Sequence, residues 1–314
     1  MIDLTRKRIT VTGGAGFLGR QIVAKLREQN CQSVFVPRSK DYDLRTLSEI
    51  ERMLRDSRPD VIIHAAAYAG GIGLNQQRPA ELFYDNAMMG IQLIHESYLA
   101  KVEKFVQIGT VCEYPKYTPV PFIEKDLWEG MPEETNSAYG LAKKMLLVQG
   151  IAYRRQYGFN SIHLLPVNMY GIFDHFDLGT SHVIPALIRK FIEAKQTNKL
   201  FVEVWGTGKV SREFLYVEDA ADAVVKAAQF YDGADPINIG SGREISIYDL
   251  VTKIKSIVDF KGAVIFNSHL PDGQPRRCLD CSRAEAVFHF TANTTLDDGL
   301  QKTIAWYLAE NTNG

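Results

Sequence analysis

Three glycines near the start of the chain constrain its fold more than any other feature. Gly13, Gly16 and Gly19 follow the apolar run RITVTG and open the helical pattern FLGRQIVAKLREQ. In a strand–turn–helix unit, glycines at this spacing allow a tight turn, a close approach of the backbone to a pyrophosphate, and close helix–strand packing. The N–H groups at the start of the helix then favour a bound phosphate. The spacing predicts a dinucleotide site; a glycine-rich turn without a ligand is the alternative.

Strands and helices alternate regularly up to about residue 170. Short apolar runs (RITVTG, SVFVP, DVIIHAAA, KFVQIGT and SIHLLPVNMYG) are separated by helical patterns such as TLSEIERMLRD, PAELFYDNAMMGIQLIHESYLAKV and SAYGLAKKMLLVQGIAYRRQYG. Such alternation gives right-handed βαβ units and a parallel sheet covered on both faces. The continuous hydrophobicity of the runs fits that burial. The sequence therefore predicts an α/β protein with a Rossmann-type doubly wound parallel sheet.

After Gly171 the predicted elements are shorter and less regular. SHVIPALIRKFIEAK and EDAADAVVKAAQFY are predicted as helices, and KLFVEVWG and AVIFNS as strands. We expect residues 1–170 to form a dinucleotide-binding domain, with about 212–240 returning to it. Residues 171–211 and 241–314 are expected to form a smaller C-terminal α/β lobe. Since there is no low-complexity tract or linker, the two parts are expected to pack tightly.

The charge balance bears on possible partners. The chain has 36 Lys and Arg against 37 Asp and Glu, so no overall basic field favours nucleic acid or a membrane surface. No run approaches about 18 consecutive apolar residues, as a membrane-spanning helix requires. The N-terminal stretch MIDLTRKRITVTGG has no apolar core and cleavage site of a secretory signal. We therefore expect a cytoplasmic protein with no nucleic-acid or membrane partner.

The four cysteines do not indicate a disulfide scaffold or a metal site. Cys31, Cys112, Cys278 and Cys281 are too few for such a scaffold in a chain of 314 residues. Cys278 and Cys281 form a CLDC motif, but a zinc site would need a second close pair of ligands. A redox CxxC normally opens a helix, whereas this one follows QPRR in a predicted strand. We expect no metal.

The end of the second predicted strand bears on the choice of dinucleotide. An NAD-selective enzyme places an acid about 20 residues after the last glycine, where it binds the ribose 2′-hydroxyl. Here that place is taken by Pro37 and Arg38, with Lys40 just beyond. Two cations suit a 2′-phosphate, which favours NADP(H) over NAD(H). Asp41 and Asp43 follow closely and leave NAD(H) open; for the two cations, a solvated loop is the alternative.

A second pattern, Tyr139-x-x-x-Lys143, lies in the helical stretch NSAYGLAKKM. Spacing of four residues puts both side chains on one face of a helix. The lysine ammonium, together with the positive ring of a cofactor, is expected to favour tyrosinate and to lower the pKa of the tyrosine. Thr110, at the end of the fourth predicted strand, adds a hydroxyl group at the same edge of the sheet.

These motifs together resemble the extended short-chain dehydrogenase/reductase family over nearly the whole chain. The strings AGGIGLNQQRPAELFYDN, GTVCEYPK, PVNMYG, TSHVIPALIRK, VWGTGKVSREFLYVED and PDGQPRR, in this order, narrow the resemblance to the GDP-L-fucose synthases. The resemblance implies a homodimer that uses NADPH for 3,5-epimerisation and 4-reduction of GDP-4-keto-6-deoxy-D-mannose. A related epimerase or 4-reductase acting on another 4-keto nucleotide sugar, such as a GDP-heptose derivative, stays open. The intact Thr110, Tyr139 and Lys143 argue against a non-catalytic dinucleotide sensor.

The resemblance also implies roles for the reacting residues. Tyr139 would act as the acid/base, Lys143 would hold the nicotinamide ribose, and Thr110 would bind the substrate oxygen. Cys112 and His182 match the pair that moves protons at C3 and C5 of the sugar. A thiol (pKa about 8.5) and an imidazole (about 6.5) suit proton transfer near neutrality. Packing is the alternative for Cys112.

Two sets of binding residues follow from the same resemblance. For the nucleotide sugar, held by the C-terminal lobe, we expect contacts from Asn168, Val183, Lys190, Trp205, Arg212 and Arg277, the arginines because they bind phosphate bidentately. Val111 stands where the nearest relatives carry a hydroxyl residue, and this leaves the identity of the hexose open. For the cofactor we expect contacts from Gly13, Gly16, Phe17, Leu18, Gly19, Arg38, Lys40, Asp43, Leu44, Ala65, Ala66, Tyr139, Lys143, Pro166, Asn168, Met169 and His182.

Overall fold

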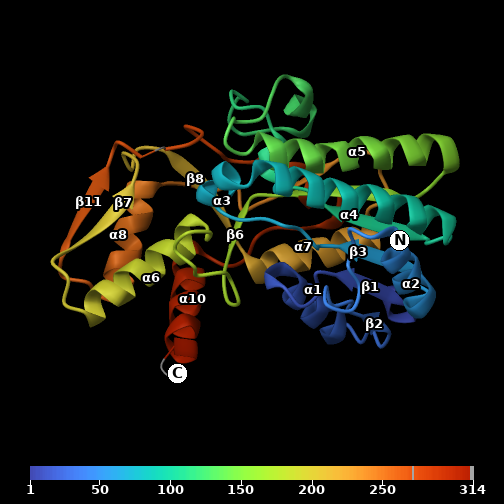
Figure 1. The fold of residues 1–314 in the computed structure, drawn as a ribbon, viewed down its shortest axis with the longest axis horizontal. Coiled ribbons are helices and arrows are strands. Elements are labelled where there is room, and N and C mark those ends of the chain that lie inside the picture. Colours follow the sequence, from blue (N-terminus) through green and yellow to red (C-terminus); the bar gives the residue numbers. More distant parts are fainter. Residues whose placement is uncertain (271, 312–314) are drawn as a thin grey trace.

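The computed structural model describes residues 1–270 and 272–311 (Figure 1). Its largest sheet has six parallel strands in the order β2-β1-β3-β4-β5-β9. The chain reverses its direction of travel across the sheet between β1 and β3, where ligands bind in open α/β sheets. The strands are β1 (Ile9–Thr12), β2 (Val34–Phe35), β3 (Val61–His64), β4 (Lys104–Ile108), β5 (Ser161–Pro166) and β9 (Ile237–Ile239).

Helices cover both faces of this sheet. Helices α1 and α7 pack together on one face, and α4 packs with α2 and α5 on the other. Ile62 and Phe105 point into the core under α2, α4 and α5. Their neighbours Ile63 and Val106 point into the core under α1 and α7, because successive strand residues face opposite sides. The predicted doubly wound sheet is confirmed. The helices are α1 (Phe17–Glu28), α2 (Leu47–Ser57), α4 (Pro79–Leu99), α5 (Ser137–Tyr157) and α7 (Val217–Phe230).

A smaller region with its own core adjoins this sheet, at the left of Figure 1. It contains a three-stranded sheet in the order β10-β8-β6 and a two-stranded sheet of β11 and β7. The strands are β6 (Asn168–Tyr170), β7 (Phe201–Trp205), β8 (Ser211–Tyr216), β10 (Glu244–Ser246) and β11 (Ala263–Asn267). The helices are α6 (Val183–Gln196), α8 (Ile247–Val258) and α10 (Leu296–Asn311).

Short helices complete the described chain. They connect longer elements or end a strand, and two of them, α3 and η2, border the cavity described below. These short elements are η1 (Leu4–Arg6), α3 (Ile72–Gln77), η2 (Val111–Glu113), η3 (Glu124–Trp128) and α9 (Ser282–Phe288).

Two sequence expectations were wrong in detail. SIHLLPVNMYG is not one strand, because the chain changes partner at Val167. The Val167 amide donates to Ile239 O of β9, whereas the next residue, Asn168, pairs with Phe214 of β8. The stretch around CLDC is not a strand either; Leu279 forms a single bridge with Phe122.

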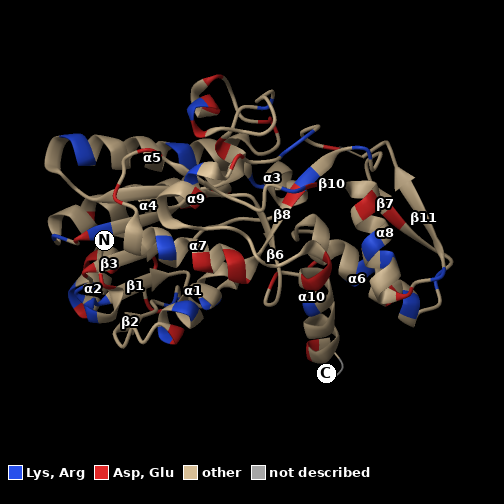
Figure 2. Cartoon of the chain, turned by 180° about the vertical axis from the view of Figure 1, so that it is seen from behind, with Lys and Arg blue, Asp and Glu red and all other residues tan. Residues whose placement is uncertain are grey.

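Within the predicted returning segment, α7 packs on α1 and β9 joins the large sheet, while β8 belongs to the three-stranded sheet. The division into a dinucleotide part and a nucleotide-sugar part stays a prediction. Basic and acidic residues are interspersed along the helices of both regions (Figure 2). Within the described residues, none of the helices combines the length and apolar character needed to cross a membrane.

Candidate active site

One cavity of about 1210 Å³ extends from the carboxyl ends of β1 and β3 to the three-stranded sheet. Typical small-molecule sites enclose about 300–1,000 Å³, so this cavity has room for a dinucleotide and a second ligand. All of the predicted catalytic and binding residues line it. They are Gly13, Gly16, Phe17, Leu18, Gly19, Arg38, Lys40, Asp43, Leu44, Ala65, Ala66, Thr110, Cys112, Tyr139, Lys143, Pro166, Asn168, Met169, His182, Val183, Lys190, Trp205, Arg212 and Arg277.

The glycine turn forms the end of the cavity at β1 and β3. Gly13 has a positive φ of 69°, and a Cβ there would lie 2.7 Å from the Ala66 amide nitrogen. A Cβ on Gly19 would overlap the Gly13 carbonyl oxygen, so α1 approaches the turn only with glycine at this position. Gly16 caps α1, whose first turn borders the cavity. This cradle, which a side chain would fill, fits a dinucleotide pyrophosphate.

Charged side chains after β2 line the same end of the cavity. Arg38 and Lys40 are exposed and border the cavity. Asp43 is engaged by Arg45, with Nη2 2.8 Å from Oδ2 and Nε 2.9 Å from Oδ1. The Arg45 hydrogen bonds hold the pKa of the Asp43 carboxyl below its usual range. Because Asp43 is already paired, Arg38 and Lys40 leave this end suited to an anion.

The end of β4 carries Thr110 and Cys112 on a short turn. Thr110 Oγ1 accepts a hydrogen bond from the Cys112 amide at 3.2 Å, which leaves its hydroxyl proton available for the cavity. Behind the turn, fully buried Glu113 accepts from the Thr110 amide at 2.9 Å. His163 Nε2 lies 3.0 Å from the same carboxylate. A Cβ on Gly109 would overlap both groups, so glycine is needed there.

Sequence reasoning missed this Glu113–His163 pair. The available signal was an acidic residue inside the otherwise buried stretch GTVCEY. Its partner could not be read from the sequence, because His163 lies 50 positions further along, on β5.

Tyr139 and Lys143 project from α5 into the cavity. Lys143 Nζ donates to Ile108 O at 3.0 Å, and burial lowers its pKa to about 8. Burial, with smaller contributions from Cys112 and Glu113, raises the pKa of Tyr139. This direction is opposite to the one expected from Lys143. A phenol that keeps its proton is suited to donate it to a substrate oxygen, as a reduction requires.

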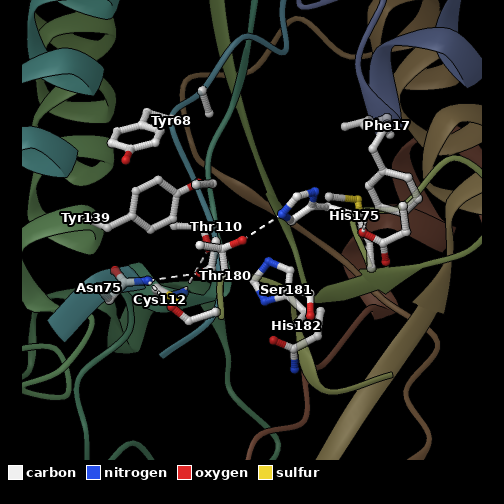
Figure 3. A pocket seen from close by; sticks show the side chains of 18 of the residues that line it. Phe17, Tyr68, Asn75, Thr110, Cys112, Tyr139, His175, Thr180, Ser181 and His182 are labelled. Carbon is white, nitrogen blue, oxygen red and sulfur yellow. Dashed lines mark hydrogen bonds between the residues drawn. The ribbon is translucent and has the colours of Figure 1, made fainter. Parts of the chain in front are cut away.

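His182 approaches from the other side of the cavity, at the start of α6 (Figure 3). Burial lowers its pKa, with further contributions from Arg277 and His175, so the imidazole is favoured in its neutral form. His175 was given no role from the sequence. Its Nε2 lies 2.6 Å from Thr180 Oγ1, and Thr180 in turn donates to Asp177 at 2.9 Å.

The AGGIGLN motif holds the segment that carries His182. The Gly71 amide donates to Thr180 O at 2.8 Å, and a Cβ on Gly71 would overlap Ser181 O. Asn75, only 4% exposed, donates to Gly70 O and Gly71 O. The sequence singled out this motif without assigning its residues; the paired glycines were the signal of a close backbone contact.

The end of the cavity nearest the small region is basic. Arg212 donates to Ser211 O at 2.7 Å and to Asp272 O at 3.0 Å, and burial together with nearby Arg277 lowers its pKa to about 9. Lys190 donates to Glu203 O at 3.1 Å. Trp205, at the end of β7, is 47% exposed. These cations and the accessible ring suit a phosphate-bearing ligand.

The surroundings of three other side chains, Val111, His64 and Cys278, favour a structural role. Val111 borders the cavity but is only 2% exposed and packs in the core of the large sheet. His64 Nδ1 lies 2.7 Å from Thr12 Oγ1, and burial, with Lys143, lowers its pKa to about 3. Burial raises the pKa of the Cys278 thiol to about 12.

A glycine cradle at the β1/β3 junction, with a Tyr–Lys pair facing a strand-end hydroxyl, defines a nucleotide-dependent oxidoreductase on a Rossmann-type sheet. The sequence model of the NAD dependent epimerase/dehydratase family matches residues 9–240, and the chain belongs to this family. It is 41% identical to a GDP-L-fucose synthase of Sinorhizobium fredii over 96% of both chains. The resemblance to the GDP-L-fucose synthases within the extended short-chain dehydrogenase/reductases is confirmed.

Two solved structures share nearly the whole fold. A GDP-6-OMe-4-keto-L-xylo-heptose reductase from C. jejuni matches with a TM-score of 0.93 and 29% identity, over 98% of this chain and 99% of that one. A GDP-L-fucose synthetase from Naegleria fowleri bound to NADP matches with a TM-score of 0.88 and 27% identity, over 98% of this chain and 95% of that one.

Proposed function

We propose that the chain is a bifunctional NADP-dependent enzyme that converts GDP-4-keto-6-deoxy-D-mannose to GDP-L-fucose by 3,5-epimerisation and 4-reduction. The observation that carries this proposal is the single cavity. It is lined at one end by the glycine cradle and, beyond the cradle, by Cys112, Tyr139 and His182. The chain is 41% identical to a GDP-L-fucose synthase over 96% of both chains, which supports GDP-4-keto-6-deoxy-D-mannose as the substrate.

The cofactor end is proposed to hold NADP(H). The backbone of Gly13, Gly16 and Gly19 would hold the pyrophosphate, and Arg38 and Lys40 the 2′-phosphate. Lys143 would hold the nicotinamide ribose. The hydride for C4 of the sugar would come from NADPH held in this way. The related synthetase from Naegleria fowleri bound to NADP supports this choice over NAD(H).

Epimerisation follows from the chemistry of the C4 ketone. The ketone acidifies the protons on C3 and C5, because the electron pair left behind spreads onto the C4 oxygen. Thr110 and Tyr139 are proposed to stabilise that oxygen by donating hydrogen bonds. Cys112 would remove a proton from one face of the ring. His182, after taking up a proton from water, would deliver it to the other face.

Reduction needs a proton for the C4 oxygen. We assign this proton to Tyr139, whose raised pKa keeps the phenol protonated. The diphosphate and the base would lie at Arg212 and Trp205. Three further residues, Asn168, Val183 and Lys190, would contact the rest of the nucleotide sugar.

The test is to incubate the protein with GDP-4-keto-6-deoxymannose and NADPH, following the absorbance of the cofactor and the stereochemistry of the product by NMR. The proposal predicts NADPH oxidation with inversion at C3 and C5. Absence of oxidation with this sugar, together with oxidation on another keto sugar, would contradict it.

A related reductase or epimerase of a GDP-heptose derivative is the second candidate. The observation that favours it is the TM-score of 0.93 to the C. jejuni heptose reductase. The same assay with a GDP-4-keto-heptose distinguishes the two.

We further propose that residues 1–170, with about 212–240, hold the dinucleotide, and that 171–211 and 241–314 hold the nucleotide sugar. The separate core around α6, α8 and α10 supports the second unit. A homodimer is also proposed. Exposed Phe83 and Tyr84 on α4, and Val148 and Tyr157 on α5, support it, and light scattering tests it. A cytoplasmic location is proposed from the sequence.

A further inference from the structure

Arg277 lies near both groups to which proton transfer is assigned. Its Nη1 is 3.8 Å from Cys112 Sγ, and its charge contributes to the lowered pKa of His182. The side chain is only 7% exposed. The sequence assigned this arginine to the diphosphate, but its guanidinium lies at the reacting cysteine. A buried guanidinium requires good partners, because removing its charge from water is costly.

The other partners of Arg277 are neutral amide oxygens. Arg277 Nε lies 3.2 Å from Gln274 Oε1, and Nη1 lies 3.4 Å from Asn168 Oδ1. Both amides are oriented by further bonds: Gln274 Nε2 donates to Lys116 O at 2.8 Å, and Asn168 Nδ2 donates to Glu213 O at 3.2 Å. Each therefore presents its oxygen to Arg277. They position the guanidinium without neutralising its charge.

Among the described residues, no carboxylate forms an ion pair with Arg277. Its neighbour Arg276 differs, since it is exposed and pairs with Glu244 at 2.6 Å. A second cation lies nearby, because Arg277 contributes to the lowered pKa of Arg212. The positive charge of Arg277 is therefore available to an anion inside the cavity.

The backbone fixes this arrangement. The Glu213 amide donates to Arg277 O at 2.9 Å, and the Leu279 amide donates to Glu213 Oε2 at 2.7 Å. The segment around Arg277 is thus attached to Glu213 of β8 at the Arg277 carbonyl and again at the Leu279 amide. Cys112 is held independently, by the hydrogen bond that its backbone amide donates to Thr110 Oγ1.

A guanidinium has only donors, so Cys112 Sγ must accept the hydrogen bond from Arg277. We propose that Arg277 is a positioning residue for epimerisation, which holds Cys112 in the thiolate form that takes the proton from the sugar. In that step a C–H bond at C3 or C5 breaks and its proton goes to sulfur. The electron pair moves into the enolate on the C4 oxygen, and the thiol later returns its proton to water.

The other titratable groups around Cys112 do not cancel this charge. Arg212 is a second cation, and Tyr139 is held as a neutral phenol by its raised pKa. The Glu113 carboxyl group lies behind the turn, where it accepts from the Thr110 amide and lies 3.0 Å from His163 Nε2. His182, across the cavity, is favoured neutral.

The direct test is the pH profile of Cys112 alkylation by iodoacetamide, measured by peptide mass spectrometry so that Cys31, Cys278 and Cys281 are resolved. An opposite charge in contact with a titrating group shifts such a profile by about one pH unit or more. Arg277→Gln is therefore expected to slow alkylation about tenfold at pH 7 and to move the profile upward. Arg277→Lys is expected to stay near the parent. The matched control Arg276→Gln is expected to match the parent. An unchanged profile in Arg277→Gln would overturn the proposal.

A second readout separates this role from diphosphate binding. With substrate in D₂O, Arg277→Gln is expected to slow deuterium entry at C3 and C5 about tenfold at pH 7, to recover at pH 9, and to change KM less than about twofold. A large rise in KM with normal exchange at saturation would overturn the proposal. The proposed role of Arg277 rests on the proposed function, but the alkylation profile is measured without substrate. A parent enzyme that fails to exchange deuterium would count against the function alone.

Folding of Arg277→Gln is checked by circular dichroism and NADPH binding. If it does not fold, Gln274→Leu replaces it, since this change removes one anchor of the guanidinium and keeps the charge. It is expected to move the alkylation profile in the same direction by a smaller amount. No movement in this variant would also overturn the proposal.

Discussion

The two ends of the cavity are built differently. At the dinucleotide end the wall beside the glycine turn is backbone: Gly13 lies against Ala66, and Gly16 caps the helix that borders the cavity. At the reacting end the working groups are side chains from four separate segments: the turn after β4, α5, the start of α6, and the stretch after β11. At the dinucleotide end, the space beside the backbone limits which residues fit. At the reacting end, the chemistry of each side chain limits which residues can function. Single substitutions should therefore abolish cofactor binding at one end and separate the two reactions at the other.

Tyr139→Phe gives the largest expected effect. It tests whether a substitution at the reacting end affects reduction without affecting cofactor binding. Loss of a general acid typically costs about 10²–10⁴ in rate, so 4-reduction should fall by that factor. NADPH binding should stay within about threefold, because the dinucleotide end is unchanged. The measurements are single-turnover NADPH oxidation and a fluorescence titration of the cofactor. A parallel loss of NADPH affinity would show that the ends are not independent.

Gly13→Ala tests the dinucleotide end, with Gly158→Ala as its matched control. Both glycines have nearly equal positive φ, 69° and 68°. A Cβ on Gly13 would lie 2.7 Å from Ala66 N, whereas a Cβ on Gly158 would have nothing within 4 Å. The control should lose about 1–2 kcal/mol for the left-handed conformation alone. Gly13→Ala should lose about 1–3 kcal/mol more from overpacking, with NADPH affinity down at least about tenfold.

The measurements are urea denaturation and a fluorescence titration of NADPH on both variants. Equal losses in the two variants would show that space at the turn does not matter.

Glu113→Gln tests the support under the reacting end. The amide still accepts from Thr110, but its NH₂ group faces His163, so we expect a loss of about 1–3 kcal/mol in unfolding free energy. Both reactions should slow, because Thr110 and Cys112 share this turn. The exposed pair of Lys116 and Glu134 serves as control, and Glu134→Gln should cost less than about 1 kcal/mol. Chemical denaturation measures both. If Glu113→Gln and Glu134→Gln lost similarly small amounts of unfolding free energy, Glu113 would not be supporting the turn.

His64, beneath the dinucleotide end, gives the smallest effect. Its folded pKa of about 3 lies below the ordinary 6.5, so the unfolded chain binds the proton more tightly. The stability that neutral His64 contributes is present above pH 6.5 and is lost as the pH falls toward 3. The loss is up to about 1.4 kcal/mol per pH unit. In urea denaturation at pH 7, 6 and 5, the free energy of unfolding of His64→Gln should decline less steeply with falling pH than that of the parent. His269 is exposed, so the control His269→Asn should follow the parent. Equal slopes in both variants would contradict it.

The same contrast explains what the sequence could predict. The βαβ alternation and Gly13-x-x-Gly16-x-x-Gly19 act over a few neighbouring residues, so the doubly wound sheet and the cradle were predictable. The strand partners of SIHLLPVNMYG were not, because the change from β9 to β8 at Val167 depends on segments far along the chain. The motif resemblance located the side chains of the reacting end. It could not reveal the Glu113–His163 pair, which joins the turn after β4 to β5, 50 positions further along the chain.

The central claim is that one cavity carries out proton transfer and hydride transfer with different side chains. Cys112→Ser tests it most directly, in D₂O with GDP-4-keto-6-deoxymannose and NADPH, by measuring deuterium at C3 and C5 alongside cofactor oxidation. The account predicts that deuterium entry is lost at both carbons, and that any sugar still reduced keeps its original configuration there. Deuterium entering C3 and C5 at the parent rate would show that Cys112 serves only packing.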